Sequence, residues 1–166
     1  MIHKVLLMAG LAGLLSLSAW AQDAPRFEAG LKGGAGAFGY IDDNPATRAV
    51  LGLEVCAYCS GRFALFGGFS HFLPPGAPSH YGAANLVEGG LRIQGRRRVR
   101  PFFDAGIAVA NSRFRMRTRI TGGLALGAGV TILAGPHFYI RPQARVYAMN
   151  QAYLAVAGEI GIGWRF

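Results

Sequence analysis

Residues 138–148, which read FYIRPQARVYA, alternate between two kinds of side chain without a break. One face of the extended chain carries Phe138, Ile140, Pro142, Ala144, Val146 and Ala148, and the other carries Tyr139, Arg141, Gln143, Arg145 and Tyr147. Successive side chains of a β-strand point to opposite faces of its sheet, so a period of two predicts a strand. This strand would have one apolar face and one polar face.

The same alternation extends over the rest of the chain. Residues 153–166 repeat it, with Glu159 and Arg165 on the polar face and Trp164 and Phe166 on the apolar face. In all, eight segments alternate, over residues 26–41, 50–58, 62–71, 81–93, 100–111, 120–133, 138–148 and 153–166. Most are long enough for a tilted strand to cross a bilayer, which takes about 9–11 residues. The sequence therefore predicts an all-β fold, an eight-stranded antiparallel up-and-down transmembrane β-barrel.

The predicted connections also fit such a barrel. Longer loops are predicted over residues 42–49, 72–80 and 112–119, and tight turns over residues 59–61, 94–99 and 134–137. The connection over residues 149–152 is short although it lies on the side of the longer loops. Long loops on one side and short turns on the other are typical of outer-membrane barrels, whose termini and short turns lie in the periplasm.

Composition supports the same class. The chain has 166 residues, of which 52% are hydrophobic, 15% are charged and 25 are glycines, and its mean hydropathy is +0.30. This is too apolar for a disordered chain. No apolar run after the N-terminal segment is long enough for a spanning helix. One domain uses the whole length.

The first residues resemble an export signal. Residues 1–21 contain Lys4, an apolar stretch over 5–17 and an A-x-A pattern at 19–21. This predicts a cleaved signal peptide and a barrel domain over 22–166; an uncleaved anchor is the alternative. Loss of Lys4 would lower the formal net charge from +9 to +8. A basic exported protein suits anionic lipid and lipopolysaccharide as partners, and export argues against nucleic acid.

The alternation places ten charged side chains on one face of the predicted sheet, the face that carries Arg141 and Arg145. They are Glu28, Lys32, Glu54, Glu88, Arg92, Arg100, Asp104, Arg141, Arg145 and Glu159, five acids and five bases. An eight-stranded barrel is only wide enough for side chains to fill its interior, where charges must pair. We therefore predict an inward-facing lumen charge network. In the alternative, a soluble lipocalin-like barrel, these charges would face water.

The last hairpin resembles a known family. Residues 139–147 (YIRPQARVY) and 158–166 (GEIGIGWRF) are similar to the last hairpin of small OmpA-like outer-membrane β-barrel proteins. The resemblance implies a lumen of paired Arg and Glu, and it implies that Trp164 and Phe166 form the signal read by the barrel-assembly machinery. Gln143 stands where the family would have an acid, so partners for Arg141 and Arg145 are expected from Glu54, Glu88, Asp104 and Glu159. The peptidoglycan-binding domain of larger members is not expected here, because the predicted barrel uses residues 22–166.

Two groups of arginines lie between the predicted strands. Arg96, Arg97 and Arg98 occupy a tight turn, and Arg113, Arg115, Arg117 and Arg119 occupy the third long loop. Guanidinium groups at the outer rim suit bidentate contacts to lipopolysaccharide phosphates. The alternative is a solubilising loop with no fixed partner.

Cys56 and Cys59, in the sequence CAYC, are a disulfide candidate because export favours oxidation. A thioredoxin-like site would need a βαβ context, and a zinc site would need further ligands. We therefore predict no cofactor and no metal.

Ser70–His71 and Ser79–His80 suggest lipid A-modifying chemistry, but adjacent residues on a strand point to opposite faces. Aromatic girdles are expected from Phe63, Phe69, Phe72, Tyr81, Phe102, Tyr153 and Trp164. The sequence thus favours a monomeric, non-enzymatic outer-membrane barrel with a structural or surface-interaction role. A narrow porin-like pore for small ions is the alternative, and a lipid A-modifying enzyme ranks third.

Overall fold

The computed structural model describes residues 27–40, 47–75, 81–114, 117–150 and 153–166. The predicted signal peptide over 1–21, the first residues of the predicted mature chain and Arg115 lie outside the described residues. So do Ser79 and His80.

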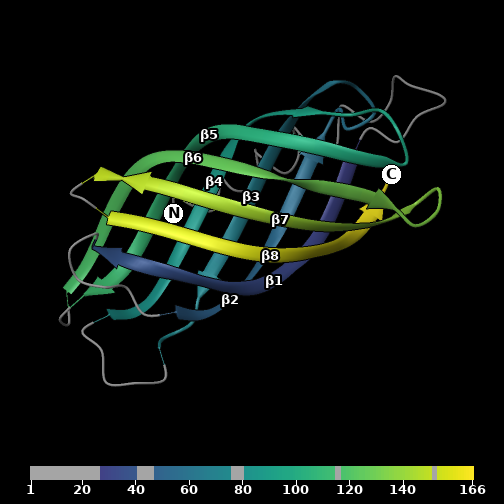
Figure 1. The fold of residues 1–166 in the computed structure, drawn as a ribbon. Helices are drawn as coiled ribbons and strands as arrows, with labels where there is room; N and C mark the ends of the chain where they lie inside the picture. Colours follow the sequence, from purple (N-terminus) through teal and green to yellow (C-terminus); the bar gives the residue numbers. More distant parts are fainter. Residues whose placement is uncertain (1–26, 41–46, 76–80, 115–116, 151–152) are drawn as a thin grey trace, which may run out of the picture.

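The described residues form a closed antiparallel β-barrel of eight strands (Figure 1). The strands are β1 (Phe27–Tyr40), β2 (Thr47–Ala57), β3 (Phe63–Phe72), β4 (Tyr81–Gln94), β5 (Val99–Phe114), β6 (Arg117–Leu133), β7 (Phe138–Met149) and β8 (Tyr153–Arg165). Each strand pairs with the next in the sequence, and β1 pairs with β8 to close the ring. The predicted fold class is confirmed.

The predicted third long loop, over residues 112–119, is wrong. β5 continues to Phe114 and β6 begins at Arg117, and their ladder pairs Ser112 with Arg119 and Arg113 with Thr118. The arginines of this stretch interrupt the apolar face, so the alternation does not mark it as strand. A hairpin that projects beyond a membrane needs no apolar face, so the ladder can continue through charged residues.

The barrel has two distinct ends. At the first, which we call the terminal end, β1 begins and β8 ends, and Phe27 and Phe166 exchange backbone hydrogen bonds of 3.3 and 2.9 Å. The turns over 58–62, 95–98 and 134–137 lie there too. We call the opposite end, where β1 meets β2 and β7 meets β8, the loop end.

Among the described residues, no helix is long and apolar enough to cross a membrane.

The outer wall of the barrel is apolar. Side chains that point away from the axis leave large hydrophobic surfaces uncovered, and those of Ile107 and Ile120 are 67% and 72% exposed. Others of this kind are Leu31, Leu51, Leu53, Val87, Leu91, Leu124 and Ile160. A continuous apolar wall of this extent is typical of a barrel that faces lipid.

The interior is filled and differs between its two halves. Toward the loop end, the core consists of apolar and aromatic side chains from all eight strands, among them Phe38, Val50, Phe72, Leu86, Tyr147, Met149 and Tyr153. Toward the terminal end and in the middle, the buried side chains are mainly charged or polar. The polar face of the alternation therefore points into the barrel, as the transmembrane prediction requires.

The β6–β7 ladder has a local irregularity at Pro142. The β6–β7 ladder is interrupted between the pairs Gly129–Gln143 and Ile132–Ile140. Proline has no N–H to donate, so a sheet hydrogen bond is missing beside it. Inside the barrel at this level, the Arg141 Nε donates a hydrogen bond of 2.8 Å to the Thr131 Oγ1 and links the same two strands.

Candidate functional site

The structure brings nine of the ten predicted lumen charges into two groups of ion pairs. The first, which we call the central cluster, consists of Lys32, Glu88, Arg92, Asp104, Arg145 and Glu159. Arg145 lies at its centre, with Nη1 2.8 Å from Glu88 and Nη2 2.8 Å from Asp104. Arg92 binds Asp104 through two parallel hydrogen bonds of 2.7 and 2.8 Å. With three acids and three bases, the central cluster is formally neutral.

Lys32 completes the central cluster from β1. Its Nζ lies 3.1 Å from Glu88 and 3.3 Å from Glu159. Gln143, where the family resemblance led us to expect an acid, donates a hydrogen bond of 3.0 Å from Nε2 to Glu159. An amide at this position keeps the count of charges balanced, because a fourth acid would leave one carboxylate without a cation.

The second group, the terminal cluster, consists of Glu28, Glu54, Arg141 and Arg165. Arg141 contacts Glu28 through Nη2 and Glu54 through Nη1, the latter at 2.9 Å, and Arg165 Nε lies 3.1 Å from Glu28. The Tyr139 hydroxyl donates to Glu54 at 3.1 Å. This cluster has two acids and two bases, so it is neutral as well. A buried charge without a partner would cost several kcal/mol.

Two aromatic rings separate the guanidinium groups. Arg92 lies 4.1 Å and Arg141 5.6 Å from the ring centroid of Phe102. Phe66 lies in the same way near Arg92 and Arg145, at 5.9 and 5.0 Å. Such cation–π contacts stabilise arginines that face one another in a dry interior.

Three of the predicted girdle aromatics are wrong. Phe72, Phe102 and Tyr153 are buried inside the barrel, whereas Phe63, Phe69 and Trp164 are exposed on its wall. The alternation already predicts that Phe102 points inward, because Phe102 and Asp104 are two residues apart and therefore lie on the same face of the strand. Residue type alone does not determine which face of a strand carries a side chain. The side chain of Tyr81 is not among those that the structure describes.

Arg100 differs from its predicted role. It donates hydrogen bonds of 3.0 Å to the carbonyl oxygens of Cys59 and Arg97, and it therefore ties two turns of the terminal end together. Arg165 is the second cation beside Glu28. The alternation had placed Arg165 on the polar face, but the set of lumen charges omitted it.

Arg48 was also missed, because the predicted second strand began two residues after it. The side chain is buried near the loop end and donates to the carbonyl oxygens of Gly82 and Phe38, at 2.9 and 3.3 Å.

The disulfide candidate lies at the terminal mouth of the lumen. Cys56 and Cys59 are joined in a disulfide, and both are buried. The turn that it holds has Tyr58 at φ +60°, in the left-handed region, and the Cys59 carbonyl oxygen accepts hydrogen bonds from Gln94 and Arg100. The turn is thus held by a covalent bond on one side and by side-chain donors on the other.

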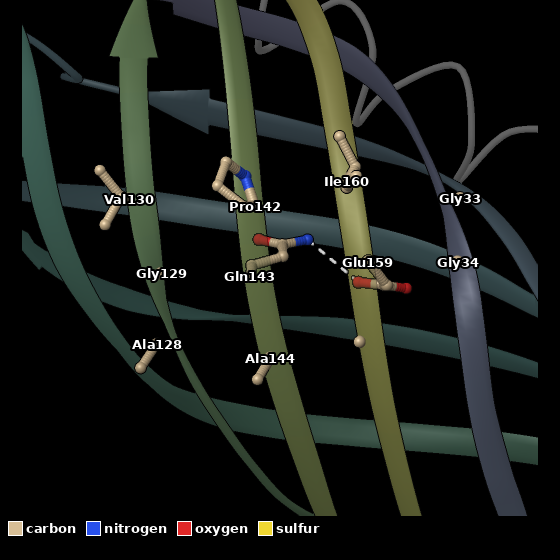
Figure 2. Close-up of a pocket in the computed structure, with 11 residues that line it drawn as sticks. Gly33, Gly34, Ala128, Gly129, Val130, Pro142, Gln143, Ala144, Glu159 and Ile160 are labelled. Carbon is tan, nitrogen blue, oxygen red and sulfur yellow. Dashed lines mark hydrogen bonds between the residues drawn. The ribbon is translucent and has the colours of Figure 1, made fainter.

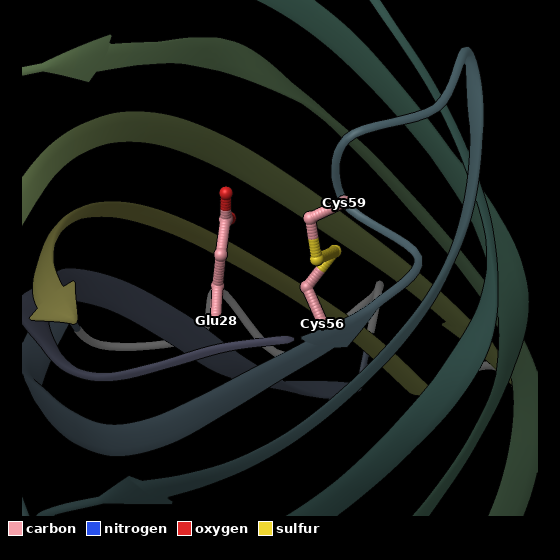
Figure 3. Close-up of side chains that lie close together, drawn as sticks. All are labelled: Glu28, Cys56 and Cys59. Carbon is pink, nitrogen blue, oxygen red and sulfur yellow. A yellow bond between two sulfur atoms is a disulfide. The ribbon is translucent and has the colours of Figure 1, made fainter. Parts of the chain in front are cut away.

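The side chain of Glu28 lies beside the disulfide (Figure 3), and the ligand atoms of Glu28, Cys56 and Cys59 lie within 4.8 Å of one another. Metals bind the thiolate form of cysteine, whereas these two sulfurs are bonded to each other. The carboxylate of Glu28 already accepts from Arg141 and Arg165. The oxidised protein therefore offers a poor metal site.

Replacement of Cys56 and Cys59 by serine is expected to lower the free energy of unfolding by about 2 kcal/mol, the chain-entropy value for so short a loop. The barrel should still close, because Gln94 and Arg100 hold the turn independently. Urea unfolding of both proteins in detergent measures the difference. Labelling of two thiols in denatured wild-type protein without reductant would show that the disulfide does not form.

The arginines of the predicted third loop do not share one face. Arg113 is exposed on the outer side of the β5–β6 hairpin, and Arg119 pairs with Ser112, whose side chain is buried on the lumen side. Arg117 has the parity of Arg119, whose Nη1 lies 3.2 Å from the hydroxyl of Tyr40. Of the described arginines in this group, Arg113 is thus the one directed away from the barrel axis.

The residues considered for lipid A chemistry do not form a nucleophile–base pair. Ser70 is buried in the lumen, whereas His71, on the opposite face, lies with Nδ1 2.7 Å from Asn85 Oδ1.

A shallow hollow of about 560 Å³ lies on the outer wall over β6, β7, β8 and β1 (Figure 2). It forms where a row of directly paired small residues crosses the wall, namely Ala35, Gly158, Ala144 and Ala128. Gln143 and Glu159 lie beneath it, joined by their hydrogen bond.

Comparison with solved structures gives the class of the fold. Neisserial surface protein A is similar with a TM-score of 0.69 and 10% identity, over 87% of this chain and 100% of that one. The N-terminal barrel domain of Pseudomonas aeruginosa OprF has a TM-score of 0.58 and 13% identity, over 84% and 97% of the two chains. For Ail, the attachment invasion locus protein of Yersinia pestis, the values are 0.54 and 18%, over 85% and 99%.

No family model matches the chain, and no curated protein matches it. These three similar structures are small eight-stranded outer-membrane β-barrels, which agrees with the OmpA-like resemblance of the last hairpin. Together with the apolar outer wall, this fold supports an integral outer-membrane barrel protein.

Proposed function

We propose that this protein is a non-conducting, non-enzymatic barrel of the outer membrane, whose role is structural or lies in contacts made at its surface. The observation that carries the proposal is that the lumen is filled along its length. Two neutral ion clusters occupy the terminal half and the middle, and an apolar cluster occupies the loop-end half. Neither arrangement resembles the water-filled, polar interior of a porin.

The ion clusters oppose conduction for an electrostatic reason. Arg141 and Arg145 are at most 2% exposed, and each is bound by two carboxylates. A passing ion would have to separate these pairs in a site from which water is largely excluded, which is costly. It would then meet the side chains of Phe38, Phe72 and Leu86, which offer no ligand for an ion.

Purified protein reconstituted in planar bilayers is expected to give no discrete current steps. The same preparation is run on a gel unheated and boiled, because a closed barrel resists SDS until heated, and a mobility shift shows that the silent protein is folded. Reproducible steps from folded protein would refute the closed lumen and favour the alternative, a narrow pore for small ions.

The surface role is proposed to involve lipopolysaccharide at the loop end. Arg113 would present its guanidinium to phosphates of the outer leaflet, because its side chain points away from the barrel axis. Support by analogy comes from Ail, similar to this chain with a TM-score of 0.55 and 16% identity, whose structure is known in complex with the heparin analogue sucrose octasulfate. We further propose that the protein is monomeric and that Trp164 and Phe166 direct its assembly.

A further inference from the structure

Four arginines gather at the terminal end of the barrel, on two neighbouring turns. Arg62 belongs to the β2–β3 turn, and Arg96, Arg97 and Arg98 belong to the β4–β5 turn. All four side chains are exposed. The two turns are joined, because Gln94 donates from its backbone N–H to Arg62 at 2.9 Å and from its side chain to Gly61 at 3.1 Å. We call these four residues the basic patch.

The patch has a fixed backbone. The carbonyl oxygen of Arg97 accepts from Arg100 at 3.0 Å. Arg98 is tied to Leu133 twice, through its carbonyl oxygen and through its Nε, both at 3.0 Å. The chain is thus held in place while Arg62, Arg96 and Arg97 present their guanidinium groups to the surroundings.

Among the described residues, no acidic side chain balances the positive charge of the patch. Every acidic side chain in the part of the chain that the structure describes, from Glu28 to Glu159, is buried in the lumen and engaged in the ion clusters. The exposed charged side chains in that same part are all arginines and histidines. The patch therefore attracts anions from outside the protein.

The patch also lies where the apolar wall stops. Phe63, which is 64% exposed, follows Arg62 directly, and the exposed Ile93 and Val99 flank the β4–β5 turn on either side. In a lipid-facing barrel, these apolar side chains mark the edge of the hydrocarbon. The guanidinium groups next to them reach the level of the phosphates of the lipid headgroups.

We infer that the basic patch binds the headgroups of anionic phospholipids, such as phosphatidylglycerol, in the periplasmic leaflet. This inference rests on the proposed membrane location, since short turns and termini face the periplasm in such barrels. Guanidinium groups bind phosphate oxygens through paired N–H donors, and several close together select a charged headgroup over a zwitterionic one. The lipids around the terminal end should therefore be enriched in anionic species.

The test compares lipid that stays with the protein. Wild-type barrel is folded into bilayers of phosphatidylcholine and phosphatidylglycerol, extracted mildly, and the ratio of the two bound lipids is measured by mass spectrometry. The variant R62Q/R96Q/R97Q leaves Arg98 on Leu133 and should lower the enrichment in phosphatidylglycerol about tenfold. The matched control, R117Q/R119Q, removes two loop-end arginines on the lumen side of the β5–β6 hairpin and should keep it.

The other possible outcomes of this experiment also test the inference. Equal enrichment in wild type and in R62Q/R96Q/R97Q would overturn the inference. If the triple variant does not fold, the single variant R96Q, at an exposed turn position, must still show reduced enrichment. Wild-type protein that shows no heat-dependent mobility shift in bilayers would instead refute the membrane barrel itself.

Discussion

Replacement of Arg145 by alanine is expected to lower the free energy of unfolding of the barrel by about 3–5 kcal/mol, the usual cost of removing one partner of a buried ion pair. Arg145 lies between Glu88 and Asp104 in the central cluster, 2.8 Å from each. Its loss leaves three acids facing two bases in a buried interior. Urea unfolding in detergent, followed by gel mobility, measures the change.

Two further variants separate lost charge pairing from lost packing. Arg113→Ala removes an exposed arginine and should change the free energy of unfolding by less than about 0.5 kcal/mol. Adding Glu88→Gln to Arg145→Ala removes the excess negative charge and should recover part of the loss. An Arg145→Ala protein as stable as wild type would contradict an inward-facing network.

Replacement of Gly34 by alanine is expected to destabilise the barrel by about 3 kcal/mol, at the upper end of the usual cost of overpacking. At Gly34, β1 and β8 approach so closely that a Cβ would overlap the carbonyl oxygen of Gly158 and lie 2.8 Å from Cα of Glu159. Both neighbours are backbone atoms of the strand that closes the ring, so neither can move aside as a flexible side chain would.

The neighbouring strand supplies the control for this prediction. Gly158 pairs with Ala35, one residue along the same ladder, but a Cβ there would have no atom within 4 Å. Gly158→Ala should therefore leave the free energy of unfolding within about 1 kcal/mol of wild type. Similar values for the two alanine variants, measured by the same unfolding assay, would show that close approach of the backbones does not limit closure.

The fold was predictable because alternate side chains of each strand face different surroundings, an apolar exterior and a polar lumen. From Phe138 to Ala148, the apolar side chains were predicted to face outward and the polar ones inward. The alternating burial along β7 agrees with this prediction. The extension of β5 and β6 to Phe114 and Arg117 was not predictable in this way. Beyond the membrane, both faces of a hairpin meet polar surroundings, so the pattern that marks a strand disappears.

The composition of the lumen was predictable, but its pairing was not. Parity places Glu28 and Arg141 on the inner face, yet it does not say that they meet, since they are 113 residues apart in the sequence. The alternation alone does not give the position of a side chain along the barrel axis, because that position depends on strand tilt and register. For the same reason, Arg100 was expected in the ion network, whereas it lies at the terminal end and binds the carbonyl oxygen of Cys59.

Some ion pairs join strands that are far apart in the sequence, and this limits how the barrel can form. Arg165 of β8 binds Glu28 of β1 across 137 residues, and Arg141 of β7 binds Glu54 of β2 across 87. No single hairpin contains these partners, so a half-assembled sheet in the bilayer would hold bare charges against hydrocarbon. Each such charge raises the free energy of a partly inserted chain. Insertion and ring closure should therefore occur as one concerted step, with open-sheet intermediates too high in free energy to accumulate.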